Sequence, residues 1–176
     1  MNDTQLILQF KQGNTRVFNA IVERHKKRIY FFALKLSQDH QKAEDISQET
    51  FLRAYNKLHT LKEESSFVPW LYRIASNYYR SIIRRPMLKV VSDVDLNSLA
   101  IDRQEEDDNE MEKAMKCAIA QLPKKQKVAL VLRCFEGLSY KEISQIMGIS
   151  NSAAKAHVSY ARNKLRDLME RTNDEM

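Results

Sequence analysis

Glycine and proline are rare in this chain, with three of each among 176 residues. β-Hairpins and tight strand connections depend on these two residues for their turns, so their scarcity favours an all-α fold. The longest apolar runs, at 29–34 and 128–132, are much shorter than the roughly 18 to 20 residues that a membrane-spanning helix needs. The first residues also lack a basic stretch followed by an apolar one, so we expect no secretion signal and a cytoplasmic protein.

The residues that most often carry enzyme chemistry are scattered. Cys117 and Cys134 are isolated from each other, and the histidines share no metal-ligand spacing with them. The sequence also contains no P-loop, dinucleotide fingerprint or nucleophile elbow. We therefore predict a protein that is not an enzyme and that has no catalytic residue, metal or cofactor. A nucleic-acid-processing enzyme is correspondingly disfavoured.

Charge is distributed in blocks along the chain. Residues 1–92 carry a net charge of +8, residues 93–112 a net charge of −8 and residues 113–176 a net charge of +6. We interpret these blocks as two small helical domains joined by an acidic linker. The linker is either a self-repelling solvated connector or a connector that also binds a partner. The two basic blocks are typical of a protein that binds a polyanion, most often nucleic acid.

Two helices are predicted in the first half of the N-terminal block. One covers residues 15–36, with Asn14 as its N-cap, and the other begins after Asp39. The second helix has an acidic and amide face that is either an ordinary solvated surface or a docking patch for a basic surface. Helical spacing brings together four polar residues there, namely Asp45, Gln48, Glu49 and Arg53. Arg53 follows Glu49 by four residues and is placed to form an ion pair with it.

A third predicted helix carries a basic stripe. Ser65 or Ser66 caps it and Pro69 lies in its first turn. Between Val68 and Ser92 there is no acidic residue, whereas a solvated helix face normally mixes both signs. We therefore favour nucleic-acid contact, with phosphates held by charge and bases stacked on neighbouring rings. The stripe consists of Arg73, Asn77, Arg80 and Arg84, with Arg85 at its end and Tyr72 and Tyr79 beside it.

The C-terminal block has the pattern of a helix-turn-helix. Ser139 and Glu142 form a capping box, a short helix ends at Gly148, and Ser150 caps a longer last helix. The alternative without a binding role is a helical hairpin with a solvated outer face. Short polar residues near the start of the last helix and basic residues further along favour DNA reading in the major groove. The outer face comprises Asn151, Ser152, Lys155, Ala156, Ser159, Arg162 and Arg166.

Three segments resemble, in order, the bacterial RNA polymerase sigma factors of the extracytoplasmic-function (ECF) type. Residues 43–53 (AEDISQETFLR) are similar to sigma region 2.2, and residues 67–77 (FVPWLYRIASN) are similar to regions 2.3 and 2.4. The segment that runs from Leu122 and Pro123 through 138–143 (LSYKEI) to 161–165 (ARNKL) is similar to region 4. The resemblance covers nearly the whole chain.

What the resemblance implies is a factor that binds core RNA polymerase, directs it to specific promoters and assists promoter melting. Asp45, Gln48, Glu49 and Arg53 would bind the clamp helices of the β′ subunit, and the C-terminal domain would dock on the β subunit. The helix at 151–166 would read the −35 element, and the acidic linker would run through the polymerase cleft. The −10 element would be held as single-stranded DNA by Lys62, Phe67, Arg73, Asn77, Arg80, Arg84 and Arg85.

Several positions depart from the family pattern. Ser81 replaces a frequent acidic residue, and His157 and Tyr160 replace frequent arginines, so the base sequences recognised cannot be carried over. Whether an anti-sigma factor is a further partner stays open. The alternative function is a helix-turn-helix regulator that binds duplex DNA without polymerase.

Overall fold

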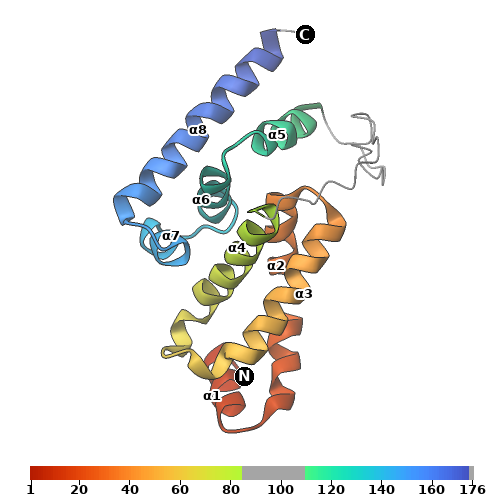
Figure 1. Ribbon diagram of the computed structural model, residues 1–176, viewed down its shortest axis with the longest axis vertical. Helices are drawn as coiled ribbons and strands as arrows, with labels where there is room; N and C mark the ends of the chain where they lie inside the picture. Colours follow the sequence, from red (N-terminus) through yellow and green to blue (C-terminus); the bar gives the residue numbers. More distant parts are fainter. Residues whose placement is uncertain (85–109, 175–176) are drawn as a thin grey trace.

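The computed structural model describes residues 1–84 and 110–174, and within these ranges it contains helices and no strand (Figure 1). The all-α prediction is therefore confirmed. The α-helices are α1 (Asp3–Lys11), α2 (Phe18–Ser37), α3 (His40–Lys57), α4 (Phe67–Arg84), α5 (Glu110–Ala120), α6 (Lys124–Cys134), α7 (Tyr140–Met147) and α8 (Asn151–Asp174). Short 3₁₀ turns lie at Thr15–Val17, Leu58–Thr60 and Glu64–Ser66. No helix in these ranges is long and apolar enough to span a bilayer.

Helices α2, α3 and α4 form the body of the N-terminal domain, and α1 covers one end of it. A sharp corner joins α2 to α3. Gln38 takes the left-handed conformation (φ 54°), and its N–H donates to the Leu34 carbonyl at 2.7 Å. The Asp39 carboxylate then accepts the Lys42 backbone N–H at 3.0 Å, which caps α3 and lowers the pKa of Asp39. The predicted start of this helix after Asp39 is confirmed.

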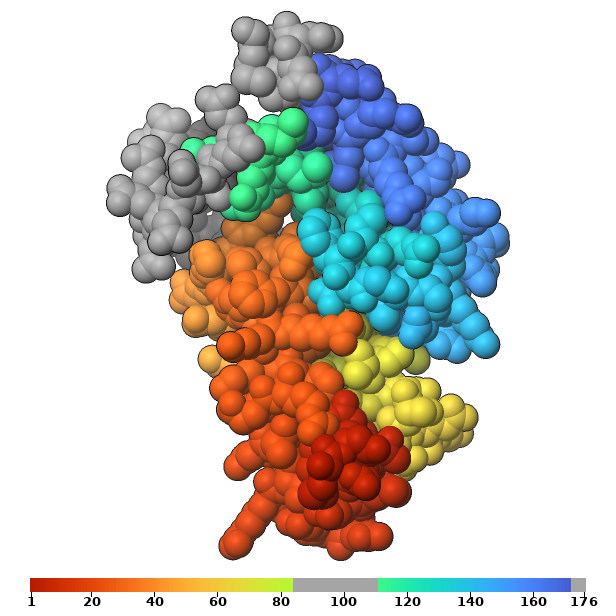
Figure 2. Space-filling view, turned by 180° about the vertical axis from the view of Figure 1, so that it is seen from behind, coloured from red at the N-terminus to blue at the C-terminus, as the bar shows by residue number. Residues whose placement is uncertain are grey.

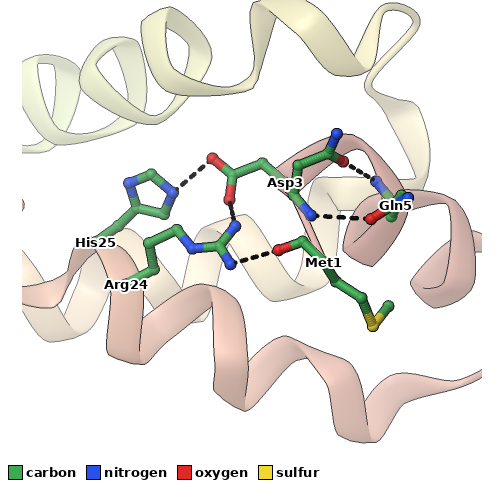
Figure 3. A network of polar contacts seen from close by, with 6 residues as sticks. Met1, Asp3, Gln5, Arg24 and His25 are labelled. Atoms are coloured by element: carbon green, nitrogen blue, oxygen red, sulfur yellow. Dashed lines mark hydrogen bonds and ion pairs between the residues drawn. The ribbon is translucent and has the colours of Figure 1, made fainter.

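A polar network fixes α1 to α2 (Figure 3). The Asp3 carboxylate, in the first turn of α1, accepts from the Arg24 guanidinium and lies 2.8 Å from Nε2 of His25. Arg24 also donates to the Met1 carbonyl at 2.7 Å. His25 is buried, and its ring packs edge-on against Phe67 with centroids 5.5 Å apart. The start of the chain is thereby tied to the beginning of α4 as well as to α2.

Helices α7 and α8 form the helix-turn-helix, and α6 packs against both. The Glu142 backbone N–H donates to the Ser139 hydroxyl at 3.2 Å, and the Glu142 carboxylate accepts the Ser139 N–H at 2.8 Å. Gly148 ends α7 in the left-handed conformation (φ 65°), which glycine adopts without strain. The Ser150 hydroxyl accepts the Ala153 N–H at 3.1 Å. The predicted capping box, turn glycine and serine cap are all confirmed.

The two domains pack directly against each other. Helix α7 lies along α4, and α6 lies against α2. Figure 2 shows the cyan residues of the C-terminal domain in contact with the orange surface of α2. One continuous hydrophobic cluster contains buried residues of both domains, including Phe32 and Leu71 from the first and Leu132 and Ile143 from the second.

Three local expectations were wrong. The helix expected from residue 15 begins at Phe18, because Thr15–Val17 forms a 3₁₀ turn and the Asn14 side chain makes no capping hydrogen bond. A 3₁₀ turn at Glu64–Ser66 precedes α4, so α4 begins at Phe67 without a serine cap. Helix α5 starts at Glu110, so it includes the last three residues of the expected linker, and the rest of the linker lies outside the described residues.

Candidate polymerase and nucleic-acid interfaces

The acidic patch on α3 has the expected helical geometry. Asp45 and Gln48 are exposed and Glu49 is half-buried. Oε1 of Glu49 accepts from Nε of Arg53 at 2.6 Å, so the expected i, i+4 ion pair is present. The Arg53 guanidinium also lies 4.7 Å from the centre of the Tyr78 ring on α4. The patch is therefore held in place by the neighbouring helix.

An open groove between α2 and α3 adjoins this patch. Phe31 on α2 lines this groove and is 51% exposed, and Leu52 on α3, one turn after Glu49, is 57% exposed. Sequence reasoning missed this apolar component, because helical spacing alone does not separate an exposed phenylalanine from a buried one. The groove is lined by Lys26, Lys27, Tyr30, Phe31, Glu44, Ser47 and Gln48.

The basic stripe on α4 is partly assembled as expected. Arg73 and Asn77 are exposed, and the half-buried Arg80 donates to the Asn77 side-chain oxygen. The side chain of Arg84 and the whole of Arg85 lie outside the described residues. A shallow recess continues the stripe toward the second domain. It is lined by residues of α4 and by two lysines from the start of α6, in full Asn77, Arg80, Ser81, Lys124 and Lys125.

Aromatic residues near the stripe do not present their faces to solvent. Phe67, expected at the −10 site, is 1% exposed and packs between His25 and Trp70, so its ring does not face solvent in this conformation. Tyr72 and Tyr79 are also buried, and no base can stack on them in this conformation. Burial raises the pKa of Tyr79 to about 12, and its hydroxyl donates to the Leu36 carbonyl at 3.0 Å. Burial of Tyr72 depends on the C-terminal domain, which a local pattern in α4 cannot reveal.

Other expected nucleic-acid contacts are accessible. Lys62 is exposed in the turn before α4. On α8 the apolar side is buried through Ala154, Val158 and Ala161, so the opposite side of the helix faces solvent. Ala156 is half-buried there, and the remaining expected residues are exposed: Asn151, Ser152, Lys155, Ser159, Arg162 and Arg166. Tyr160, 62% exposed, adds an aromatic ring to this face.

No group of three or more histidine, cysteine or acidic side chains in residues 1–84 and 110–174 could hold a metal ion. The surfaces consist instead of charged, amide and apolar side chains on helices.

The sequence of the chain matches two family models and several known proteins. The model of Sigma-70 region 2 matches residues 21–86, and that of Sigma-70, region 4 matches residues 112–165. RNA polymerase sigma-H factor of Pseudomonas aeruginosa is 31% identical over 176 residues, which cover 93% of this chain and 91% of that protein. ECF RNA polymerase sigma factor SigM of Bacillus subtilis is 33% identical over 159 residues, with 88% and 97% covered.

Solved structures agree with this fold. The sigma factor RpoE of Bartonella quintana, in complex with the anti-sigma factor NepR, superimposes with a TM-score of 0.66 at 26% identity, covering 87% of this chain and 96% of that one. CnrH, in complex with the cytosolic domain of CnrY, gives a TM-score of 0.72 at 23% identity, covering 96% and 97%, which supports the fold alone. The chain belongs to the ECF RNA polymerase sigma factors, the proteins that direct RNA polymerase to promoters.

Proposed function

We propose that this sigma factor binds core polymerase, the −10 element and the −35 element through three separate surfaces. Domain 1–92 binds core polymerase through α3 and the −10 element through α4, residues 93–112 connect the domains, and domain 113–176 binds the −35 element through α8. The observation that carries the proposal is the joint presence, in one chain, of an exposed acidic patch on α3 and two separate basic surfaces on α4 and α8.

The polymerase surface combines Asp45, Gln48 and Glu49 with the adjoining groove. The carboxylates and amide suit a basic helix of the β′ subunit, while Phe31 and Leu52 offer apolar contact area beside them. Interfaces of this kind derive most of their affinity from a few central apolar or aromatic residues, and charges at the rim set orientation and association rate. Both components fit one helical partner better than a disordered or small-molecule one.

The DNA surfaces have distinct roles. Arg73, Asn77 and Arg80, with Arg84 and Arg85, hold the non-template strand of the −10 element, and exposed Lys62 assists. Their guanidinium groups supply strong, oriented phosphate contacts that offset part of the cost of opening the duplex. On α8 the small side chains of Ser152 and Ala156 allow close approach to bases.

In the −35 complex, basic residues along α8 meet phosphates or guanine. The residues assigned to this contact are Asn151, Ser152, Lys155, Ala156, Ser159, Arg162 and Arg166. We further propose an anti-sigma factor as a cytoplasmic partner, because the similar RpoE structure was solved with one.

Core binding by a double variant, Gln48→Ala with Glu49→Ala, tests the proposal. Loss of two contacts at a protein interface commonly costs about 1 to 3 kcal/mol, so we expect core affinity to fall roughly 5- to 150-fold with helicity unchanged. The matched control is Glu63→Ala with Asn19→Ala, which removes one carboxylate and one amide from exposed positions outside the groove lining. Equal core binding by both variants would remove the α3 patch from its proposed role.

A polymerase-independent regulator is the less supported function. Such a protein binds duplex DNA through its helix-turn-helix alone and has no use for the exposed α3 patch. Promoter binding by the purified chain, measured with and without core enzyme, separates the two functions. A sigma factor gains promoter affinity on adding core enzyme, whereas an autonomous regulator does not.

A further inference from the structure

One lysine ties the segment between α3 and α4 to α1. The Lys11 ammonium, in the last turn of α1, donates to Oε1 of Glu64 at 2.6 Å and to the backbone carbonyl of Leu61. Helix α1 lies against both 3₁₀ turns of this segment, Leu58–Thr60 and Glu64–Ser66 (Figure 1). The side chains of Lys11 and Glu64 are 23% and 22% exposed, so most of the pair is covered. We call Lys11, the Leu61 carbonyl and Glu64 the Lys11 bracket.

The bracket encloses the tip of the turn. Its two acceptors belong to residues 61 and 64, and between them stand Lys62 and Glu63, which are both exposed. The Leu61 side chain is 7% exposed and packs in the core, while its carbonyl meets the ammonium. Beyond the tip, the Ser66 N–H donates to the Glu63 carbonyl at 3.0 Å. One ammonium therefore restrains the backbone on both sides of Lys62.

Helix α1 is itself fixed to its neighbours. The Phe10 ring packs against the Phe18 and Tyr55 rings, with centroids 5.7 Å and 5.3 Å away. At the other end of α1, Asp3 contacts His25, whose ring packs against Phe67 at the first residue of α4. The segment that leads into α4 is thus held at residues 61 and 64 by Lys11 and at residue 67 through His25.

The Lys11 ammonium is poorly placed to attract DNA by its own charge. Two of its three donors are used by Leu61 and Glu64. The hydrogen bond from Lys11 lowers the pKa of the Glu64 carboxyl, so this group is ionised at neutral pH. The two opposite charges offset each other toward a polyanion. Any effect of Lys11 on DNA binding therefore passes through the shape of the turn.

We infer that Lys11 is a positioning residue for the −10 element, because the Lys11 bracket fixes the backbone around Lys62 and the entry into α4. The inference rests on the proposed contact of Lys62 and α4 with the −10 strand. Ordering backbone and long side chains on binding costs conformational entropy, and a turn that is ordered beforehand avoids this cost. The bracket thus strengthens −10 binding without touching the strand.

Two variants of the full chain, Lys11→Met and Glu64→Ala, test this inference in reconstituted holoenzyme. The probe is a single-stranded oligonucleotide with the −10 sequence of a selected promoter, and a scrambled sequence serves for comparison. Each variant should bind the −10 probe about 3- to 10-fold more weakly, the effect of leaving one or two more side chains to be ordered on binding. Binding of the scrambled probe, which depends mainly on charge, should change less. Lys113→Met, at an exposed position of α5, controls for the loss of one positive charge.

The direction of the Glu64→Ala effect separates positioning from simple charge. Removal of a carboxylate beside a polyanion strengthens binding if charge alone matters, whereas the bracket predicts weaker binding. The salt slope should stay unchanged in Lys11→Met, but it would fall by about 0.7 if the ammonium met a phosphate of the single strand. Glu64→Gln keeps an oxygen acceptor for Lys11 and should recover most of the affinity.

Amide hydrogen exchange follows the turn itself. The Leu61 N–H, which donates to the Leu58 carbonyl at 3.2 Å, and the Ser66 N–H should both exchange faster in Lys11→Met, while amides within α2 keep their protection. Core binding and helicity should match the wild type. If Lys11→Met loses helicity, Glu64→Ala decides, because it leaves α1 unchanged.

The remaining outcomes are distinct. Wild-type affinity and discrimination in both variants, tighter binding by Glu64→Ala or a lower salt slope in Lys11→Met would overturn the inference. Equal losses of −10 and core binding in both variants would assign Lys11 to the fold alone and would overturn it as well. Failure of the wild-type holoenzyme to bind the −10 probe would instead contradict the proposed function, and hydrogen exchange would still decide whether Lys11 orders the turn.

Discussion

Ser139→Ala tests whether the capping box holds the helix-turn-helix in shape. The substitution removes the hydroxyl that accepts the Glu142 N–H at 3.2 Å and leaves that donor without its partner at the start of α7. Loss of a serine N-cap costs about 1 kcal/mol, within a range of about 0.5 to 2 kcal/mol. For a chain of this size, that corresponds to a fall in Tm of about 2 to 4 °C.

The same substitution should change the response to acid. Hydrogen bonds from the Ser139 hydroxyl and then from its backbone N–H lower the pKa of Glu142. A lowered folded-state pKa contributes stability above the unfolded value, which is near 4.5, and this contribution is lost as pH falls through the folded value. The stability difference between wild type and Ser139→Ala should therefore shrink as pH falls below about 4.5.

Ser144→Ala is the matched control, because it makes the same chemical change within α7. The Ser144 hydroxyl donates to the Lys141 carbonyl, which already belongs to the helix, and alanine is the better helix former. We expect a change within about 0.5 kcal/mol. Thermal melts of the three proteins at pH 7 and pH 4 provide the comparison. If Ser139→Ala melts together with Ser144→Ala at pH 7, the capping argument is refuted.

Two further predictions concern the binding surfaces. Lys155→Ala should weaken promoter binding by holoenzyme and lower the salt slope by about 0.9 if the ammonium meets a phosphate. Lys164→Ala should not, because its ammonium donates to the Gln121 backbone carbonyl at 3.2 Å, between α5 and α6. An unchanged slope with an altered base preference would instead indicate base readout. Phe31→Ser should weaken core binding roughly tenfold or more without lowering Tm, because this ring is already half exposed. Wild-type affinity would exclude the groove from the polymerase interface.

Local signals in the sequence predicted much of the fold. The capping box at Ser139, the left-handed glycine at 148 and the cap at Ser150 each depend on residues within one turn of the helix. Helix α1 was not predicted, although Asn2 and Gln5 form a second capping box that the same rule could have identified.

Properties that depend on distant parts of the chain were not predictable in this way. The acidic face of α3 and the basic faces of α4 and α8 follow from helical spacing, so which residues share each face could be predicted. The burial of Tyr72 and Glu136 arises from contact between domains that are far apart in sequence. The burial of Phe67 arises from its packing against His25 on α2. Exposure of Phe31 has the same origin, since no helix of residues 1–84 and 110–174 covers its ring fully.

The most direct test of the account is promoter-specific transcription by a reconstituted holoenzyme. Promoters are first selected with core polymerase and the purified protein, and run-off transcription is then measured on a selected template and on a template with a scrambled −10 element. The account predicts defined transcripts from the selected template only when the protein is added, together with an opened −10 region. Core enzyme that neither retains the protein nor gains promoter-specific transcription from it would contradict the assignment of these surfaces.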